Sequence, residues 1–264
     1  MRRLTKDFIV ISLILFICLL TNIAKGIADD SLVLHLIFDE GQGNTVTDDS
    51  IYHNDGVIKG GPQWVDGKSG SALQFDGVDD TVEIPNADSL NMTNAVTIEM
   101  WVKLDADGPS SNQVGIEKGG WETGEYSLYA FYVPGNGSAM QFQDLPENCG
   151  DANAGHLGPN IKDGQWHYIA GAWDGNTINI YTDGELNDSW DCQGGSLGKN
   201  DKSVYIASRL GNQRLLKGLI DEVRIYNRSL SQAEIQDDMA SFGPAAVSPL
   251  EKTSVCWGKI KQMY

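Results

Sequence analysis

The stretch Gly218-Leu-Ile-Asp-Glu-Val-Arg-Ile-Tyr-Asn-Arg228 decides the fold of this chain. Leu219, Val223 and Ile225 share one parity, as the side chains on one face of a strand do, and Asp221 falls on that parity as a polar intruder. The pattern predicts a β-strand that is buried on at least one face.

A short helix is expected directly after this strand. The following segment, Ser229-Leu-Ser-Gln-Ala-Glu-Ile235, places Ser231 and Glu234 at the spacing of a capping box. The strand therefore runs into a helix that begins just after Ser231.

Short strand-like runs separated by turn signals fill the chain before this point. Pairs such as Asp76-Gly77, Asp174-Gly175 and Asp183-Gly184 supply the positive φ that tight turns require. The expected strands cover residues 32–39, 72–75, 81–84, 96–104, 114–117, 126–133, 140–143, 167–173, 177–182, 204–208 and 219–226. The pattern predicts an all-β fold, a two-sheet antiparallel β-sandwich with one short helix after the closing strand.

Several further segments carry a family resemblance. They include Leu36-Ile-Phe-Asp-Glu-Gly41, Ala72-Leu-Gln-Phe-Asp-Gly-Val-Asp-Asp80, Thr97-Ile-Glu-Met-Trp-Val-Lys103 and Asp163-Gly-Gln-Trp-His-Tyr-Ile-Ala-Gly-Ala-Trp-Asp-Gly175. With the closing strand, this ordered set resembles the laminin-G-like jelly-roll family, the concanavalin A-like lectin/glucanase sandwich. The resemblance implies a jelly-roll domain over residues 29–242 and an extracellular recognition module that binds carbohydrate or protein.

The two ends of the chain differ from this domain. Residues 1–28 combine basic residues, the apolar run 8–20 and small residues at 24, 26 and 28, which is the layout of a secretory signal peptide. Residues 243–264 read as a linker and a short tail. We expect a secreted or cell-surface protein that meets a membrane only through an uncleaved signal or the tail.

The chain is acidic, with a formal net charge of −17. This charge disfavours nucleic acid, because phosphate binding needs a basic face. The expected partners are a glycan or an extracellular protein, and the sequence predicts no particular oligomeric state.

Oxygen-bearing side chains near glycine-rich turns suggest calcium, which takes six to eight oxygen ligands. The candidate ligands are Asp39, Asp49, Asn54, Asp76 and Asp221. The resemblance implies a structural Ca²⁺ between the end of the first strand and the closing strand, where Asp39 and Asp221 stand. The alternative is that these side chains cap turns through their own backbone, as Asp and Asn often do.

Sugars stack on exposed aromatic rings and bond to nearby polar groups, and the segments around Trp121 and Trp190 look like loops. The candidate glycan-binding residues are Trp121, Tyr126, Asn148 and Trp190. The alternative for the two tryptophans is that they close the ends of the sandwich. Cys149 and Cys192 are a candidate disulfide in an exported chain, and two unlinked thiols are the alternative.

Catalysis is the competing class of function. Retaining glycosidases use two carboxylates about 5 Å apart, and Glu99 has no acidic partner at residue 97 or 101. Asp221 and Glu222 are adjacent, so a regular strand would point them to opposite faces. We therefore expect a non-enzymatic carbohydrate-binding module, with a protein-binding adhesion or scaffold domain as the alternative. A divergent glycoside hydrolase or lyase is the third and least favoured class.

Overall fold

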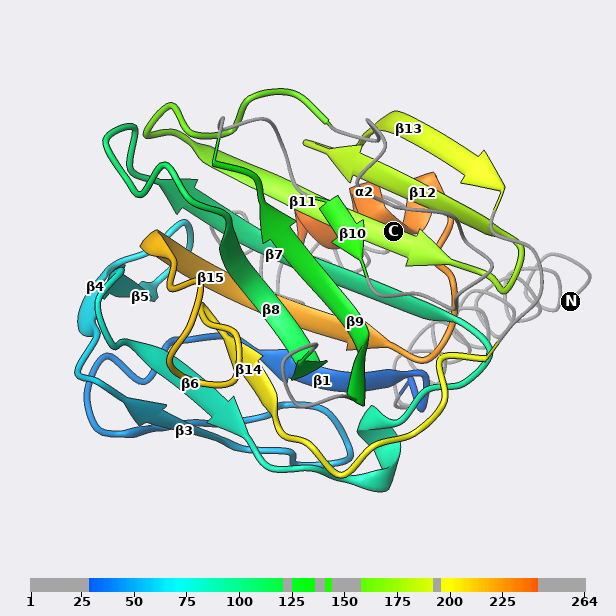
Figure 1. Ribbon diagram of the computed structural model, residues 1–264, viewed down its shortest axis with the longest axis horizontal. Helices are drawn as coiled ribbons and strands as arrows, with labels where there is room; N and C mark the ends of the chain where they lie inside the picture. The colour runs from blue at the N-terminus through cyan, green and yellow to red at the C-terminus, as the bar shows by residue number, and fades with distance from the viewer. Residues whose placement is uncertain (1–28, 121–124, 136–140, 144–157, 192–195, 242–264) are drawn as a thin grey trace, which may run out of the picture. The chain divides into compact units, whose positions relative to one another are not determined.

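The computed structural model describes residues 29–120, 125–135, 141–143, 158–191 and 196–241 (Figure 1). Contacts divide the chain into two units, residues 1–30 and 31–264. The strands and the α-helix of the described part all lie in the second unit.

Two antiparallel sheets form this unit. Sheet A has the strand order β13-β12-β11-β7-β15-β5-β4, and β1 also pairs with β15. Its strands are β1 (Leu32–Leu36), β4 (Gln63–Asp66), β5 (Ser71–Asp76), β7 (Val96–Leu104), β11 (Trp166–Trp173), β12 (Thr177–Thr182), β13 (Glu185–Asp191) and β15 (Lys217–Tyr226). Sheet B has the order β10-β9-β8-β14-β6-β3-β2. Its strands are β2 (Thr45–Val46), β3 (Gly56–Lys59), β6 (Thr81–Ile84), β8 (Gln113–Gly120), β9 (Glu125–Val133), β10 (Gln141–Gln143) and β14 (Val204–Ile206).

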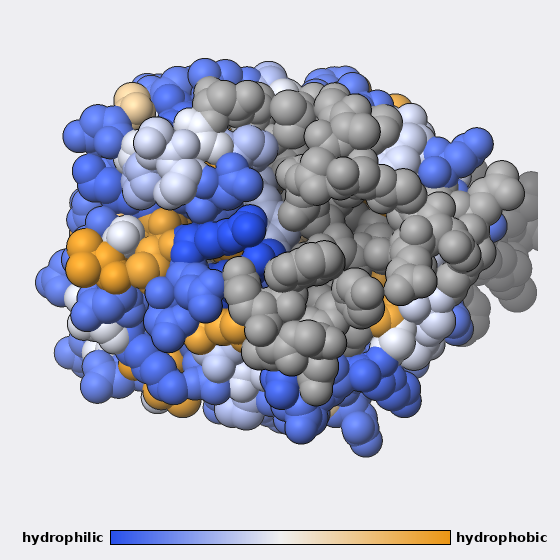
Figure 2. Space-filling model, viewed as in Figure 1, coloured by the Kyte–Doolittle hydropathy of each residue, from blue (hydrophilic) through white to orange (hydrophobic). Residues whose placement is uncertain are grey.

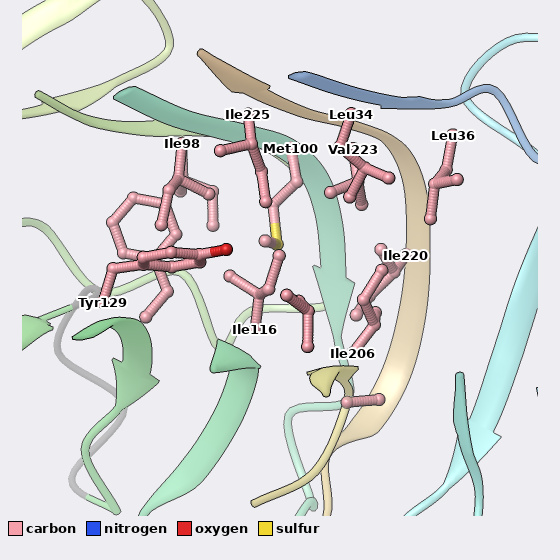
Figure 3. Packing of buried hydrophobic residues seen from close by; sticks show 14 of the residues in the cluster. Leu34, Leu36, Ile98, Met100, Ile116, Tyr129, Ile206, Ile220, Val223 and Ile225 are labelled. Carbon is pink, nitrogen blue, oxygen red and sulfur yellow. The ribbon is translucent and has the colours of Figure 1, made fainter. Parts of the chain in front are cut away.

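The hydrophobic core lies between the two sheets, which confirms the predicted sandwich. Figure 3 shows Ile116, Tyr129 and Ile206 of sheet B facing Ile98 and Met100 of sheet A. All of these side chains are fully buried. Figure 1 shows β8, β9 and β14 crossing in front of β7 and β15, so each sheet also has an outer face.

The closing strand β15 differs from the simple alternation that its sequence suggests. Its pairing with β7 shifts register between Asp221 and Arg224, and Glu222 adopts a φ of 54°. This irregularity changes the parity, so that Ile220 joins Val223 and Ile225 in the core. Leu219 is only half-buried and was wrongly grouped with the core residues, because a β-bulge adds one residue to the strand.

The helix α2 (Gln232–Ala240) follows β15 and confirms the predicted capping box. The Ser231 side chain accepts a hydrogen bond from the Glu234 backbone N–H, and the Glu234 side chain binds the Ser231 backbone N–H in return. Ile235 is buried in a second cluster with Trp101 and Tyr168. The helix therefore packs on the outer face of sheet A.

Three of the strands that were not expected, β2, β3 and β4, are only two to four residues long. A fourth, β13, has the polar sequence Glu-Leu-Asn-Asp-Ser-Trp-Asp and forms an edge of sheet A. Polar edge strands lack the apolar alternation that identifies a strand from sequence. Among the residues that the structure describes, no helix is long and apolar enough to cross a membrane.

Candidate functional site

The outer face of sheet B carries a continuous row of side chains across five strands. Backbone pairing aligns Tyr205 of β14 with Glu83 on one side and with Glu117 on the other. The row is Val57, Glu83, Tyr205, Glu117 and Ala130. Residues aligned in this way point to one face of the sheet, so two carboxylates flank one tyrosine.

Glu117 lies at the centre of a buried polar group on this face. Arg209 Nε donates to both carboxylate oxygens of Glu117 at 3.1 Å, and Tyr132 Oη donates to Glu117 Oε1 at 2.7 Å. The side chains of Arg209 and Glu117 are 3% and 0% exposed. A buried ion pair is stable only with such additional hydrogen bonds, so this group is rigid.

Glu83 forms a second, more open polar group. It pairs with Lys59 Nζ and accepts from Ser203 Oγ at 2.8 Å and from Tyr205 Oη at 3.3 Å. The hydrogen bond from Lys59 is the main cause that lowers the pKa of the Glu83 carboxyl. Glu83 therefore stays ionised at neutral pH and accepts hydrogen bonds from hydroxyl groups.

A strained loop from Ala207 to Leu216 lies against this face. Three of its non-glycine residues, Ala207, Leu210 and Arg214, have positive φ angles of 65°, 52° and 46°. The backbone is held by hydrogen bonds from Ala207 N to Gly115 O and from Val114 N to Arg214 O, both 2.8 Å. Backbone strain held in place by its surroundings is common at functional sites.

The same face is polar in its surface view. Figure 2 shows strongly hydrophilic side chains bordering a hydrophobic patch on the side where β8, β14 and β6 lie in Figure 1. Arg214 and Val57 are exposed, and Tyr205 and Glu83 are half-buried. The row is therefore open to solvent toward its β3 end.

Two of the predicted calcium ligands come together at the edge of the sandwich. Asp39 Oδ1 accepts a hydrogen bond from Ser71 N at 2.8 Å, and Asp221 Oδ2 accepts from the backbone N–H groups of Lys68 and Ser69. Both carboxylates thus hold the β4–β5 loop, and a Cβ at Gly70 would lie 1.9 Å from Asp39 Oδ1. The alternative prediction was that these side chains cap turns of their own backbone, whereas both of them bind a loop that is distant in sequence.

Asp221 nevertheless keeps one carboxylate oxygen available. Its Oδ1 atom is buried and accepts no hydrogen bond. Burial raises the pKa of this carboxyl to about 7, and the neighbouring carboxylates of Glu222 and Asp39 also raise it. A cation would supply the missing partner for this oxygen.

The other three predicted ligands lie elsewhere. Asn54 Nδ2 donates hydrogen bonds to Val33 O and Ser89 Oγ. Asp49 is exposed. The neighbouring Asp48 is buried and accepts hydrogen bonds from the backbone of the turn. Asp76 is the last residue of β5, whereas Asp39 contacts Ser71, the first residue of the same strand. It belongs to a separate acidic group with Asp79 and Asp80, whose carboxylate oxygens lie within 4.8 Å of one another.

The predicted glycan-binding residues are only partly described. Trp121, Asn148, Cys149 and Cys192 lie outside the described residues, and Tyr126 is placed only as a backbone position of β9. Trp190 belongs to the strand β13 and packs against the core, so its assignment to a loop was wrong. Its packing agrees with the alternative that it closes the sandwich.

Sequence reasoning did not find the row on sheet B. Glu83, Glu117 and Tyr205 lie in three strands that are far apart in the chain, and only the pairing register brings them together. The one available signal was their alternation with the buried residues Val82, Ile84 and Ile116.

Comparisons with known proteins agree with this architecture. A family model described as the concanavalin A-like lectin/glucanases superfamily matches residues 76–236, more than half of the chain. Among proteins with curated descriptions, none matches the chain.

Three solved structures illustrate the likeness in fold. The binding domain of Paraclostridial Mosquitocidal Protein 1 is 16% identical, with a TM-score of 0.56 over 79% of this chain. The chain spans about half of that structure, at 51% of its length. Domain 4 of AbnA, a GH43 extracellular arabinanase from Geobacillus stearothermophilus, is 20% identical, with a TM-score of 0.57 over 79% of this chain and 98% of that one. Trypanosoma rangeli sialidase is 17% identical, with a TM-score of 0.54 over 79% of this chain and 32% of that one.

Proposed function

The chain belongs to the concanavalin A-like lectin/glucanase superfamily, and from that premise we propose that it is a non-catalytic carbohydrate-binding module. Its binding surface is the outer face of sheet B around Tyr205. The observation that carries the proposal is the row in which Tyr205 stands between Glu83 and Glu117 beneath a strained loop.

The chemistry of this row suits a sugar. Half-buried Tyr205 offers a ring and a hydroxyl group, and Glu83 is an ionised acceptor for sugar hydroxyl groups. The rigid Glu117–Arg209 pair fixes the floor of the site, so little side-chain order is lost on binding. A structural neighbour adds support, since the arabinanase domain that the chain covers at 98% was solved with arabinotriose.

The electrostatics favour binding over catalysis. Adjacent strands lie about 4.8 Å apart, so the Glu83 and Glu117 backbones are about 10 Å apart, whereas retaining glycosidases hold their carboxyl groups at about 5 Å. A general acid also needs a raised pKa, and that of Glu83 is lowered. The carboxyl group of Glu99 does have a raised pKa, but it is buried in sheet A, where α2 packs.

A glycan array probed with the full chain tests this proposal, with the Tyr205→Ala variant as its partner. We expect wild type to bind a defined set of glycans and Tyr205→Ala to lose at least tenfold in affinity. The control is Tyr181→Ala, which removes a buried tyrosine from sheet A instead, and binding is compared only for variants that urea unfolding shows to be folded. Equal binding by wild type and Tyr205→Ala would exclude this face, and no glycan binding by wild type would favour a protein partner.

We also propose a structural Ca²⁺ at the edge of the sandwich. The residues present fit such an ion, because Asp221 Oδ1 is a buried acceptor without a donor and Asp39 is its acidic neighbour. Asp39 and Asp221 would hold the ion together with carbonyl oxygens of the β4–β5 loop. The bound ion would supply positive charge that keeps Asp221 ionised.

The proposed location is outside the cell. The support is the signal-like sequence of residues 1–28, which combines a basic start, an apolar run and small residues. Amino-terminal sequencing of the exported protein would identify the cleavage point.

A further inference from the structure

We infer that the ligand of sheet B is an anionic glycan, and that its carboxylate or sulfate group binds the guanidinium of Arg214. This inference rests on the proposed carbohydrate-binding function and adds the charge of the ligand. It is carried by the ion pairs of the face and by the position of Arg214.

Four charged side chains of this face form two ion pairs. Glu117 is paired with Arg209, and Glu83 is paired with Lys59. These four charges cancel. Arg214 forms no ion pair with any residue that the structure describes, so it adds one unpaired positive charge beside these two balanced ion pairs.

Arg214 is held in place by an aromatic ring and by its own backbone. Its guanidinium carbon lies 5.4 Å from the centroid of the Tyr132 ring, which also stacks with Arg209 at 5.0 Å. Its carbonyl oxygen accepts a hydrogen bond from Val114 N at 2.8 Å, so the backbone is fixed to β8. The side chain is thus exposed and at the same time preorganised beside the row.

The backbone of Arg214 is strained. Arg214 has a φ of 46°, a left-handed conformation that glycine adopts without cost and that other residues adopt with difficulty. Glycine would therefore be more stable here. Strain of this kind is common at ligand-binding positions, and here it holds a guanidinium at the surface.

The guanidinium of Arg214 determines which ligand chemistry fits this face. A planar guanidinium binds a carboxylate or a sulfate through two parallel N–H···O bonds, which adds direction as well as charge. Glu83, on β6, remains available as an acceptor for hydroxyl groups elsewhere along the same glycan chain. The two groups together select a glycan that has both hydroxyl groups and an acidic substituent.

The test measures the affinity of the full chain for four polymers by isothermal titration calorimetry. Polygalacturonate carries carboxylates, dextran sulfate carries sulfates, and dextran and arabinan are neutral. We expect at least one of the anionic polymers to bind at least tenfold more tightly than both neutral ones. Comparison of the two anionic polymers identifies the acidic group.

Variants at Arg214 locate the effect. Arg214→Gln should lose at least tenfold in affinity for the preferred anionic polymer, and Arg214→Lys should lie between Arg214→Gln and wild type, because lysine keeps the charge without the two-pronged geometry. Lys68→Gln is the matched control, since it removes an exposed positive charge from sheet A, where Lys68 lies over Trp101. It should leave the affinity unchanged.

Arg214→Gly separates binding from folding. It should raise the melting temperature by a few degrees and still lose the anionic ligand. Unchanged anionic affinity in Arg214→Gln overturns the inference. If wild type prefers neutral polymers and Tyr205→Ala abolishes that binding, the inference fails while the proposed function stands. If wild type binds none of the four polymers and no glycan on the array, both fail.

Discussion

Lys118 is a charged side chain that is fully buried at the end of β8. Its ammonium group donates to Asn86 Oδ1 and to the carbonyl oxygen of Lys202. Burial lowers the pKa of this group to about 8, from an ordinary value of 10.5. The folded protein therefore releases this proton at a lower pH than the unfolded chain does.

The sign of the resulting pH effect follows from this difference. Between pH 8 and 10.5 the unfolded chain binds more protons at Lys118, so the free energy of unfolding rises with pH by up to about 1.4 kcal/mol per unit. We expect the difference in urea stability between wild type and Lys118→Met to grow in favour of wild type from pH 8 to pH 10. A constant difference would mean that Lys118 is deprotonated or charged in both states.

Individual residues also show where sequence reasoning succeeds and where it does not. The structure brings Asp39 and Asp221 to one edge of the sandwich, where the resemblance puts the ends of the first and closing strands, and their binding of calcium stays a prediction. Asp49 was named as a candidate ligand, although the buried aspartate that holds this turn is Asp48. The sequence does not distinguish two adjacent aspartates, because only the backbone conformation decides which of them points inward. Arg214 was missed because its role depends on a positive φ angle and on the Tyr132 ring of β9, and the sequence shows neither.

At the scale of elements, α2 joins the sheet through one buried side chain and a few polar contacts. Ile235 is buried against the outer face of sheet A, and Tyr226 Oη donates to Asp238 Oδ2 at 2.7 Å. Sequence predicted the helix because its capping box is local. It missed the bulge in β15, because nothing in the alternation of that strand marks an inserted residue.

Ile235→Ala should lower the free energy of unfolding by about 2–4 kcal/mol, because it removes a buried side chain and leaves a cavity. Asp237→Ala, at an exposed position of the same helix, should change it by less than about 0.5 kcal/mol. Since α2 covers sheet A, glycan affinity of the folded Ile235→Ala protein should match wild type. Urea unfolding and calorimetry measure the two quantities, and a tenfold loss of affinity would place the ligand near α2 instead.

At the scale of the whole sandwich, the edge near Asp221 connects segments that are distant in sequence. Asp39 follows β1, Lys68 and Ser69 precede β5, and Asp221 lies in the closing strand 152 or 153 residues beyond them. An ion at this edge would therefore stabilise the sandwich as a unit. By mass action, Ca²⁺ at one hundred times its dissociation constant adds about 2.7 kcal/mol to the free energy of unfolding.

The measurement is thermal unfolding at pH 8 with calcium and with a chelator. Wild type should melt several degrees higher with calcium. Asp221→Asn should lose this increase, yet should melt no lower than wild type in chelator, because the amide replaces a carboxylate whose burial disfavours its charge. Asp79→Asn, in the separate acidic group with Asp76 and Asp80, is the control and should keep the full increase. Loss of the calcium effect in Asp79→Asn alone would move the ion to that group and leave Asp39 and Asp221 as residues that only hold the β4–β5 loop.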